Sequence, residues 1–252
     1  MTVKELYEHL SMIFPRELSA SWDRDGLMVC PDPARHVRRV LVTLDVTPAA
    51  VKQAVEAGVE AVISHHPLLF HPLDTLSYED PRAGKALTLA LHGISVFCFH
   101  TRADAAQGGV SDLLAEALGL ADTETLGEER ILRVGDLREE MTGEGFARFV
   151  KRALGTPSVV LADAGRPIRR VAVSGGEGKD LIGLARASGA DASLAGRFGY
   201  HALLDAAEAG LTLLEAGHYF TEVRVLDLFA RLVREATEAE VLFHREPPIS
   251  VF

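Results

Sequence analysis

The chain has few cysteines and no long apolar stretch, and both absences narrow the class of protein. Its two cysteines, Cys30 and Cys98, lie far apart and outside a C-x-x-C spacing, so they do not indicate a disulfide framework. No apolar run approaches the ~20 residues of a membrane span, and residues 1–5 contain no apolar signal region. We therefore expect a cytoplasmic protein with reduced thiols and no membrane partner.

A surplus of positive charge is also missing. The 252 residues include 26 Lys plus Arg and 36 Asp plus Glu, which gives a formal net charge of −10. The basic residues gather only in short pairs such as Arg38-Arg39 and Arg169-Arg170. Because duplex binding needs a basic stripe that displaces counterions, nucleic acid is not expected as a main partner.

The alternation of short β-branched runs with longer helical stretches predicts an α/β fold. Hydrophobic residues make up 48% of the chain, which is enough for one large core or two modest ones. Thr47 can cap a helix over Pro48–Ala57, and Gly58 can end it. Since a strand, a helix and a further strand form a βαβ unit, we expect mostly parallel strands with helices packed on the sheets. The other predicted elements are strands at Val40–Leu44, Ala61–Ile63, Ile94–Phe99, Ile131–Val134 and Val159–Leu161, and a helix over Thr142–Leu154.

Internal similarity predicts two related α/β lobes that arose by duplication. The segment Arg38–Val42 recurs as Arg169–Val173, and a glycine and an alanine further along match at the same offset. We place the lobes at 1–125 and 126–252, with a soft boundary and the option that the lobes interleave. Chance similarity between βαβ units is the alternative explanation.

A second correspondence extends the repeat towards candidate chemistry. Gly93–Val96 leads to His100, and the similar Gly210–Leu213 leads to His218. Each histidine is followed four residues later by a carboxylate. The repeat therefore pairs His100 with His218.

Polar, metal-capable side chains follow the predicted strands of the first lobe, where open α/β sheets bind ligands. His65 and His66 are neighbours, and adjacent residues leaving a strand point in opposite directions, so they suit two ions better than one. Asp104 adds a hard carboxylate oxygen. The structural alternatives are incidental histidines, Asp104 as a turn cap, and His100 as a donor to a backbone carbonyl.

The second lobe offers a further set of polar residues. His218 and Glu222 share one face of a helix that we expect to run to about Glu235. Arg197 stands where the repeat places the His-His pair, and His201 begins the next helix, so both are candidates for binding the substrate. The structural alternatives are a surface His–Glu pair and a helix-terminal polar residue.

Five of these side chains provide enough ligands for two divalent ions: His65, His66, Asp104, His218 and Glu222. Two ions exceed the charge of two carboxylates, and this excess would activate water and attract an anionic substrate. Histidine and carboxylate ligands accept Zn, Mn, Fe, Co or Ni, so the sequence does not identify the metal.

The order of these segments resembles the NIF-three-like family, also known as dinuclear metal centre proteins and GTP cyclohydrolase I type 2 homologues. The first matching block is where that family typically shows W-D-N-x-G-L. The blocks that carry the resemblance are Ser21–Asp23 with Gly26-Leu27, Leu44-Asp45, Ser64–Phe70, His100-Thr101 with Asp104, Gly175-Gly176, and Gly217–Tyr219 with Glu222.

The resemblance implies a toroidal homohexamer with two metal ions per subunit that face an internal cavity. It assigns ligand roles to the five residues above and makes Glu222 the bridge between the ions. It leaves His100 beside the metals, where this residue would orient a water molecule or move its proton, whereas the repeat would make it a ligand.

Three departures from the family pattern bear on the substrate. Arg24-Asp25 replaces the usual Asn of the first block, Arg102-Ala103 replaces Asn-Leu, and Ala195–Arg197 replaces a frequent Thr-Gly-Asp. None of them removes a ligand. We expect Arg197 and Arg102 to add positive charge near the site.

These observations favour a dinuclear metal-dependent hydrolase that acts on a small anionic substrate of nucleotide-like or phosphorylated character. The alternative is a metal-binding scaffold or regulatory protein without turnover. Structural zinc sites are typically closed and rich in thiolates, so a histidine and carboxylate set favours catalysis. A third interpretation is a ligand-binding α/β module with incidental histidines.

Overall fold

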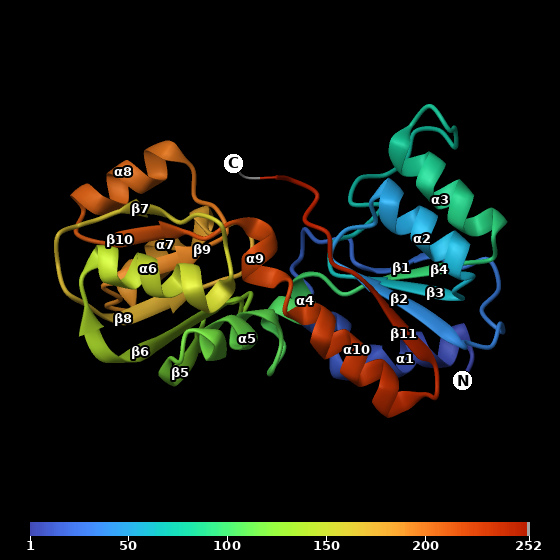
Figure 1. Cartoon of the computed structure of the whole chain (residues 1–252), viewed down its shortest axis with the longest axis horizontal. Helices are drawn as coiled ribbons and strands as arrows, with labels where there is room; N and C mark the ends of the chain where they lie inside the picture. The colour runs from blue at the N-terminus through green and yellow to red at the C-terminus, as the bar shows by residue number, and fades with distance from the viewer. Residues whose placement is uncertain (251–252) are drawn as a thin grey trace. The chain divides into compact units, whose positions relative to one another are not determined.

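The computed structural model describes residues 1–250, which form two compact units (Figure 1). The first unit combines residues 1–103 with residues 225–248, and the second consists mainly of residues 104–224. The predicted lobes were 1–125 and 126–252, with a soft boundary and the option that they interleave. The structure ends the first segment at residue 103 and returns residues 225–248 to the first unit. The reason is that a helix and a strand from the end of the chain pack with the first sheet, which makes the first unit discontinuous.

The elements of the first unit follow the alternation expected from the sequence. They are α1 (Val3–Ile13), a 3-10 turn η1 (Arg16–Leu18), β1 (Gly26–Val29), β2 (Arg39–Thr43), α2 (Pro48–Ala57), β3 (Ala61–Ser64), α3 (Pro81–Leu91), β4 (Ser95–Cys98), α10 (Val225–Ala236) and β11 (Glu240–His244). The helix α4 (Thr101–Ala105) crosses the boundary between the units.

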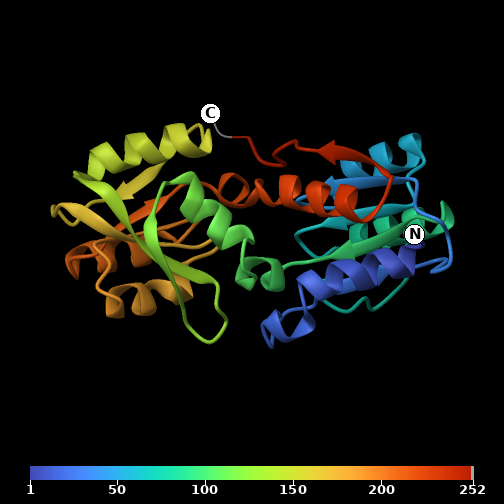
Figure 2. The same cartoon turned by 90° about the horizontal axis from the view of Figure 1, so that it is seen from below.

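The sheet of the first unit has the strand order β1-β4-β3-β2-β11. The strands β4, β3, β2 and β11 are parallel to their neighbours, and only the edge strand β1 is antiparallel. Helices α2 and α3 cover one face, and α1 and α10 cover the other (Figures 1 and 2). This arrangement buries β2, β3 and β4 on both faces, which explains their continuous apolar sequences.

The second unit contains a larger mixed sheet. Its elements are α5 (Val110–Ala117), β5 (Ala121–Leu126), β6 (Leu132–Met141), α6 (Gly143–Leu154), β7 (Val160–Ala162), β8 (Ile168–Val173), η2 (Lys179–Leu181), α7 (Ile182–Ala187), β9 (Ala192–Ala195), α8 (Tyr200–Glu208), β10 (Thr212–Glu215) and α9 (His218–Glu222). The strand order is β5-β6-β8-β9-β10-β7, with parallel pairing at β8-β9-β10 and antiparallel pairing elsewhere.

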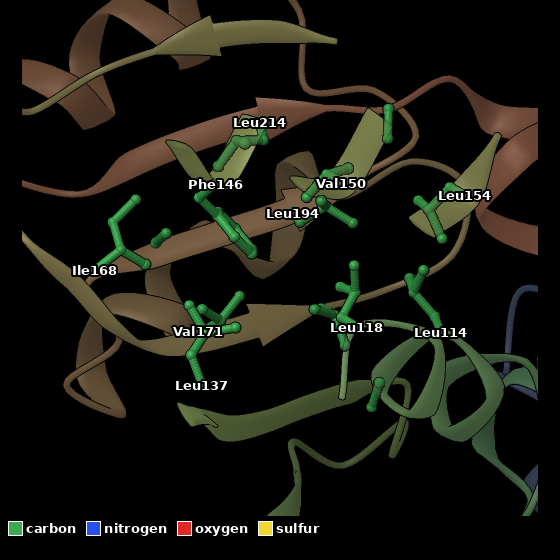
Figure 3. Packing of buried hydrophobic residues seen from close by; sticks show 14 residues of the cluster. Leu114, Leu118, Leu137, Phe146, Val150, Leu154, Ile168, Val171, Leu194 and Leu214 are labelled. Atoms are coloured by element: carbon green, nitrogen blue, oxygen red, sulfur yellow. The ribbon is translucent and has the colours of Figure 1, made fainter. Parts of the chain in front are cut away.

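Helices pack on both faces of this second sheet. Leu114 of α5 and Phe146 of α6 join Leu194 and Leu214 of the strands in one core (Figure 3). A separate core on the other face includes Ala206 of α8. The predicted class, two α/β lobes with helices packed on sheets, is thus confirmed. Antiparallel pairs appear beside the parallel centre because a short turn joins β5 to β6, and such a connection permits only antiparallel pairing.

Local signals placed the ends of α2 and α6 correctly. The Thr47 side chain accepts a hydrogen bond from the Ala50 N–H at 3.1 Å, and Gly58 ends α2 with φ +60°. Thr142 caps α6 in the same way, and Gly155 follows that helix with φ +67°. Both helices therefore match the predicted ranges to within one residue.

The helix predicted from His218 to about Glu235 is wrong in one respect, because it is interrupted. The structure has α9 over His218–Glu222 and α10 over Val225–Ala236. The buried residues of α9 pack within the second unit, whereas those of α10 pack in the first. Because the two segments bury their side chains in different units, the helix is interrupted between Glu222 and Val225.

The strand registers follow the internal repeat. Val40 pairs with Ala61 in the first sheet, and Val171 pairs with Ala192 in the second. These pairs lie at the same offset that relates the two copies of the Arg-Arg-Val segment. The register match supports a common origin of the two sheets.

The same registers correct the predicted pairing of His100 with His218. The Phe99 N–H donates to the Ser64 carbonyl in the first unit, and the Ala216 N–H donates to the Ala195 carbonyl in the second. Phe99 therefore corresponds to Ala216, and the next residue, His100, corresponds to a glycine rather than to His218. The repeat therefore aligns His100 one residue before His218, and it assigns no ligand role to His100.

Within residues 1–250, each helix is too short or too polar to cross a bilayer.

Candidate metal centre

The first unit brings three histidines together at one edge of its sheet. His65 and His66 directly follow β3, and His100 lies two residues beyond β4. Because β3 and β4 are parallel neighbours, their carboxyl ends meet at the same edge, where open α/β sheets bind ligands. A ring nitrogen of each histidine lies within 4.8 Å of one from each of the other two. This set of His65, His66 and His100 is called the histidine cluster below.

Hydrogen bonds fix which nitrogen of His65 and His66 can bind a metal. The buried His65 donates from Nδ1 to the Phe99 carbonyl oxygen at 3.0 Å, since a carbonyl can only accept. His66 uses its Nδ1 in the same way towards Asp45 Oδ1 at 2.9 Å. Both bonds place the lone pair on Nε2. A histidine that donates its other ring N–H to a carbonyl or carboxylate is typical of metal ligands.

His100 has an equivalent support. Its Nδ1 lies 2.9 Å from Oδ1 of Asp23, whose side chain is buried. Asp23 also accepts from the Thr101 backbone N–H at 3.0 Å and from the Thr101 hydroxyl at 2.5 Å. Burial favours a raised pKa for Asp23, but the hydrogen bonds from His100 and Thr101 outweigh it and hold that pKa well below its usual range. Asp23 is therefore an ionised anchor that orients the His100 ring.

Sequence reasoning did not predict Asp23 and Asp45 as partners of these histidines. Both residues are distant in sequence from the rings they hold, so no local spacing reveals the contact. Their position in the Trp-Asp and Leu-Asp blocks was the only available signal.

The second unit contains the remaining candidate ligands. Glu222 and Asp104 are both buried, and a carboxylate oxygen of each lies within 4.8 Å of the other. Nε2 of the exposed His218 lies 3.1 Å from Oε2 of Glu222, one helical turn along α9. Glu222 is thus adjacent to both other candidates. Two buried carboxylates this close concentrate negative charge, which a divalent cation would balance.

Glycines allow the backbone to approach the His218–Glu222 pair closely. At Gly176, where φ is +58°, a Cβ atom would lie 2.5 Å from Oε1 of Glu222 and 3.1 Å from Nε2 of His218. At Gly196, a Cβ atom would lie 2.6 Å from the Cα of His218. The Thr221 hydroxyl accepts from the Gly176 N–H at 3.2 Å and ties this loop to α9. A side chain at either glycine position would displace the candidate ligands.

The donor atoms in both units suit a divalent transition metal. The histidine cluster offers three imidazole nitrogens, and the second unit offers one imidazole and two carboxylates. Mixed nitrogen and oxygen donors of this kind are used by Zn, Mn, Fe, Co and Ni. The residues present therefore fit metal binding.

Comparisons with known proteins place this architecture. Residues 1–248 match the model of the family described as Duf34/NIF3 (NGG1p interacting factor 3). The chain belongs to this family. A Clostridium perfringens protein named GTP cyclohydrolase 1 type 2 homolog is 32% identical over 250 residues, covering 96% of this chain and 95% of that protein.

Solved structures agree with the family assignment. A hypothetical protein from Staphylococcus aureus superposes with a TM-score of 0.90 at 25% identity, covering 100% of this chain and 99% of that one. A Bacillus cereus protein related to NIF3 has a TM-score of 0.88 at 23% identity and covers 100% and 99% of the two chains, which shows a shared fold. The resemblance noted from the sequence is thus confirmed for the NIF3 family.

One departure from the NIF3 pattern, Arg102, has a structural explanation. Arg102 is buried, and its Nε donates to Oδ2 of the equally buried Asp25 at 2.7 Å. It also donates to the Phe14 carbonyl at 3.0 Å, and its guanidinium lies over the Phe99 ring. Arg102 was expected to add positive charge near the site. The ion pair instead neutralises it, so Arg102 serves the core of the first unit.

The two candidate substrate-binding residues lie on the surface of the second unit. Arg197 is exposed, and its backbone N–H donates to the Gly176 carbonyl at 3.0 Å, which places it on the loop beside His218. His201 is exposed at the start of α8, where its ring contacts that of Tyr200. Arg197 therefore lies in the loop after β9, which bonds to Gly176 beside His218, whereas His201 lies in the following helix, α8.

Proposed function

We propose that this NIF3 protein is a metal-dependent hydrolase that holds two divalent ions through His65, His66, Asp104, His218 and Glu222. The observation that carries the proposal is the common orientation in the histidine cluster, where each Nδ1 faces an acceptor. This arrangement directs Nε2 of His65 and His66 to a metal before any metal binds. The ions, when bound, would supply Lewis acidity and lower the pKa of water.

The carboxylates have a complementary role in the proposal. Glu222 lies beside both Asp104 and His218, which supports its assignment as the ligand shared between the ions. His100, held by Asp23, would orient a reacting water molecule or carry its proton. Arg197 would add positive charge for an anionic substrate, with His201 as a further contact.

The substrate class follows from charge and from the relatives. Two ions and Arg197 favour an anionic small molecule. The name GTP cyclohydrolase 1 type 2 homolog, which the Clostridium perfringens relative has, supports a nucleotide. We therefore propose a nucleotide or another phosphorylated compound as the substrate, hydrolysed in the cytoplasm.

Metal content is the first test of this function. After reconstitution and gel filtration, elemental analysis should find close to two divalent ions per chain. His65→Ala should lose one ion, and Glu222→Ala should weaken both. His92→Ala is the matched control, because His92 is exposed and its ring bonds to the Thr88 carbonyl of its own helix. A trace of metal in the reconstituted protein, or full occupancy in Glu222→Ala, would refute the ligand assignment.

Turnover is the second test. The metal-loaded protein should hydrolyse a member of a panel of nucleotides and sugar phosphates, and Glu222→Ala should not. Two bound ions without turnover of the panel would favour the metal-binding scaffold instead.

We also propose that the chain assembles with itself as a homohexamer, on the strength of its family resemblance. Light scattering should give a mass several times that of the 27.2 kDa chain. A monomer at micromolar concentration would refute the assembly without affecting the metal site.

A further inference from the structure

Aromatic side chains gather beside the histidine cluster in the first unit. The Trp22 ring lies 6.3 Å from the Phe70 ring and 6.1 Å from the His100 ring, measured between centroids, and both contacts are T-shaped. Phe70 and His100 are 6.4 Å apart with perpendicular rings. Despite these ring contacts, Trp22 is 50% exposed. It is the one tryptophan of a sequence in which aromatic residues make up 6%.

Hydrogen bonds hold the backbone on both sides of Trp22. Asp23, the residue after Trp22, is anchored by His100 and by Thr101. The Ala20 N–H, two residues before the indole, donates to the Thr101 hydroxyl at 2.9 Å. The residues on both sides of Trp22 are thus bonded to the segment that positions His100.

We propose that Trp22 and Phe70 form a stacking surface for a planar heterocyclic ring of the substrate. A partly exposed, fixed indole offers a π surface that accepts any nucleobase. Its position beside His100 would hold the ring next to the proposed metal site. This inference rests on the proposed function, which supplies the anionic group of the substrate. It adds a planar heterocyclic ring to that substrate, so the substrate class becomes nucleoside phosphates.

Because the chain has one tryptophan, its emission reports directly on this surface. The metal-loaded protein is titrated with guanosine 5′-monophosphate, with guanosine, and with ribose 5-phosphate, which lacks the ring. Guanosine 5′-monophosphate and guanosine should quench the emission, whereas ribose 5-phosphate should leave it unchanged. Calorimetry with Trp22→Ala should show guanosine 5′-monophosphate binding about 5- to 150-fold weaker.

Two further variants keep the test decisive. Trp22→Phe retains an aromatic face and should keep most of the affinity, even if Trp22→Ala folds poorly. Leu91→Ala is the control, because this exposed residue ends α3 and precedes β4, whereas His100 follows the other end of that strand, so the change should not affect binding. Unchanged affinity in Trp22→Ala would overturn the proposal, as would equal quenching by ribose 5-phosphate. An emission shift on simple dilution would also overturn it, since it would place Trp22 against a second copy of the chain.

Failure of the stacking surface can be distinguished from failure of the metal site. If the metal proposal fails, guanosine should still quench the emission of metal-free protein. If the stacking surface fails while metals bind, guanosine 5′-monophosphate and ribose 5-phosphate should bind the loaded protein with equal affinity and leave the emission unchanged.

Discussion

Glu60 and Asp191 perform the same task in the two units of the chain. Oε2 of Glu60 accepts from the backbone N–H groups of Arg38 and Arg39 at 2.9 and 2.8 Å. Oδ2 of Asp191 accepts from the corresponding two arginine N–H groups at 3.0 and 2.9 Å. Glu60 and Asp191 directly precede β3 and β9. Each carboxylate binds backbone N–H groups near the start of the neighbouring parallel strand, β2 or β8. The two carboxylates share this role at the same offset as the apolar segments, which supports a common origin of the two units.

Glu60→Ala should lower the free energy of unfolding by about 1–3 kcal/mol, because two partly buried N–H groups lose their acceptor. Asp191→Ala should have a smaller effect, since Asp191 is more exposed than Glu60. Glu60→Gln keeps an accepting oxygen and should remain close to the wild type. Urea unfolding checks these values. Glu8→Ala, which removes an exposed pair with Lys4, should change stability by less than about 0.5 kcal/mol. If Glu60→Ala changed the free energy of unfolding no more than Glu8→Ala, the Glu60 carboxylate would not stabilise the start of β2.

A helix or strand could be predicted from the sequence when the residues that define it lie close together in the chain. The ends of α2 and α6 were correct because Thr47, Thr142 and the glycines that follow act within one turn. The strand β5 was not predicted, because its residues 121–126 are nearly all exposed and have no apolar alternation. The return of β11 to the first sheet was also missed, since parallel pairing between distant segments leaves no local signal.

In the candidate site, too, residues in local motifs were predicted, whereas contacts between distant residues were missed. Candidate ligands such as His65 and Glu222 were found because metal-capable residues at strand and helix ends form recognisable motifs. The supports of the histidine cluster, Asp23 and Asp45, were missed because each contacts a ring distant in the sequence. The pairing of Arg102 with Asp25 was missed for the same reason.

The Arg102–Asp25 pair predicts a double-mutant effect. Arg102→Ala should lower the free energy of unfolding by about 3–5 kcal/mol, because it leaves Asp25 as a buried charge without its partner. Combining Arg102→Ala with Asp25→Asn removes both charges and should recover a large part of that loss. Urea unfolding of the single and double variants gives the coupling. Additive losses would show that the ion pair does not explain the departure at Arg102.

The role of His100 is tested by its removal. His100→Ala should keep both metals within roughly tenfold of the wild-type affinity, yet lower any hydrolytic rate by ~10²-fold or more. The reason is that His100 is expected to act on water rather than to hold an ion. Metal titration and a rate measurement separate the two roles. Loss of an ion at full reconstitution would instead make His100 a ligand, as its place in the histidine cluster also permits.

The two thiols should differ in reactivity. Burial raises the pKa of Cys98 well above its usual value, and its thiol donates to the His65 carbonyl at 3.0 Å. A raised pKa leaves less thiolate at neutral pH, so Cys98 should resist iodoacetamide. Cys30 is only half-buried and should be alkylated. Mass spectrometry should find one adduct on the folded protein and two after denaturation. Rapid labelling of Cys98 in the folded chain would show that this edge of the sheet opens readily.

Gly176 lies where any side chain would meet the candidate ligands Glu222 and His218. Gly176→Ala should cost metal binding, because its Cβ would lie 2.5 Å from Oε1 of Glu222 and must push that carboxylate aside. Gly155→Ala is a matched control in the same unit. Gly155 has a similar φ of +67°, but a Cβ there would meet nothing within 4 Å. Both variants should therefore share a backbone penalty of about 1–2 kcal/mol, and only Gly176→Ala should lose metal in elemental analysis. Full metal content in Gly176→Ala would show that Glu222 is not held against this loop when the ions bind.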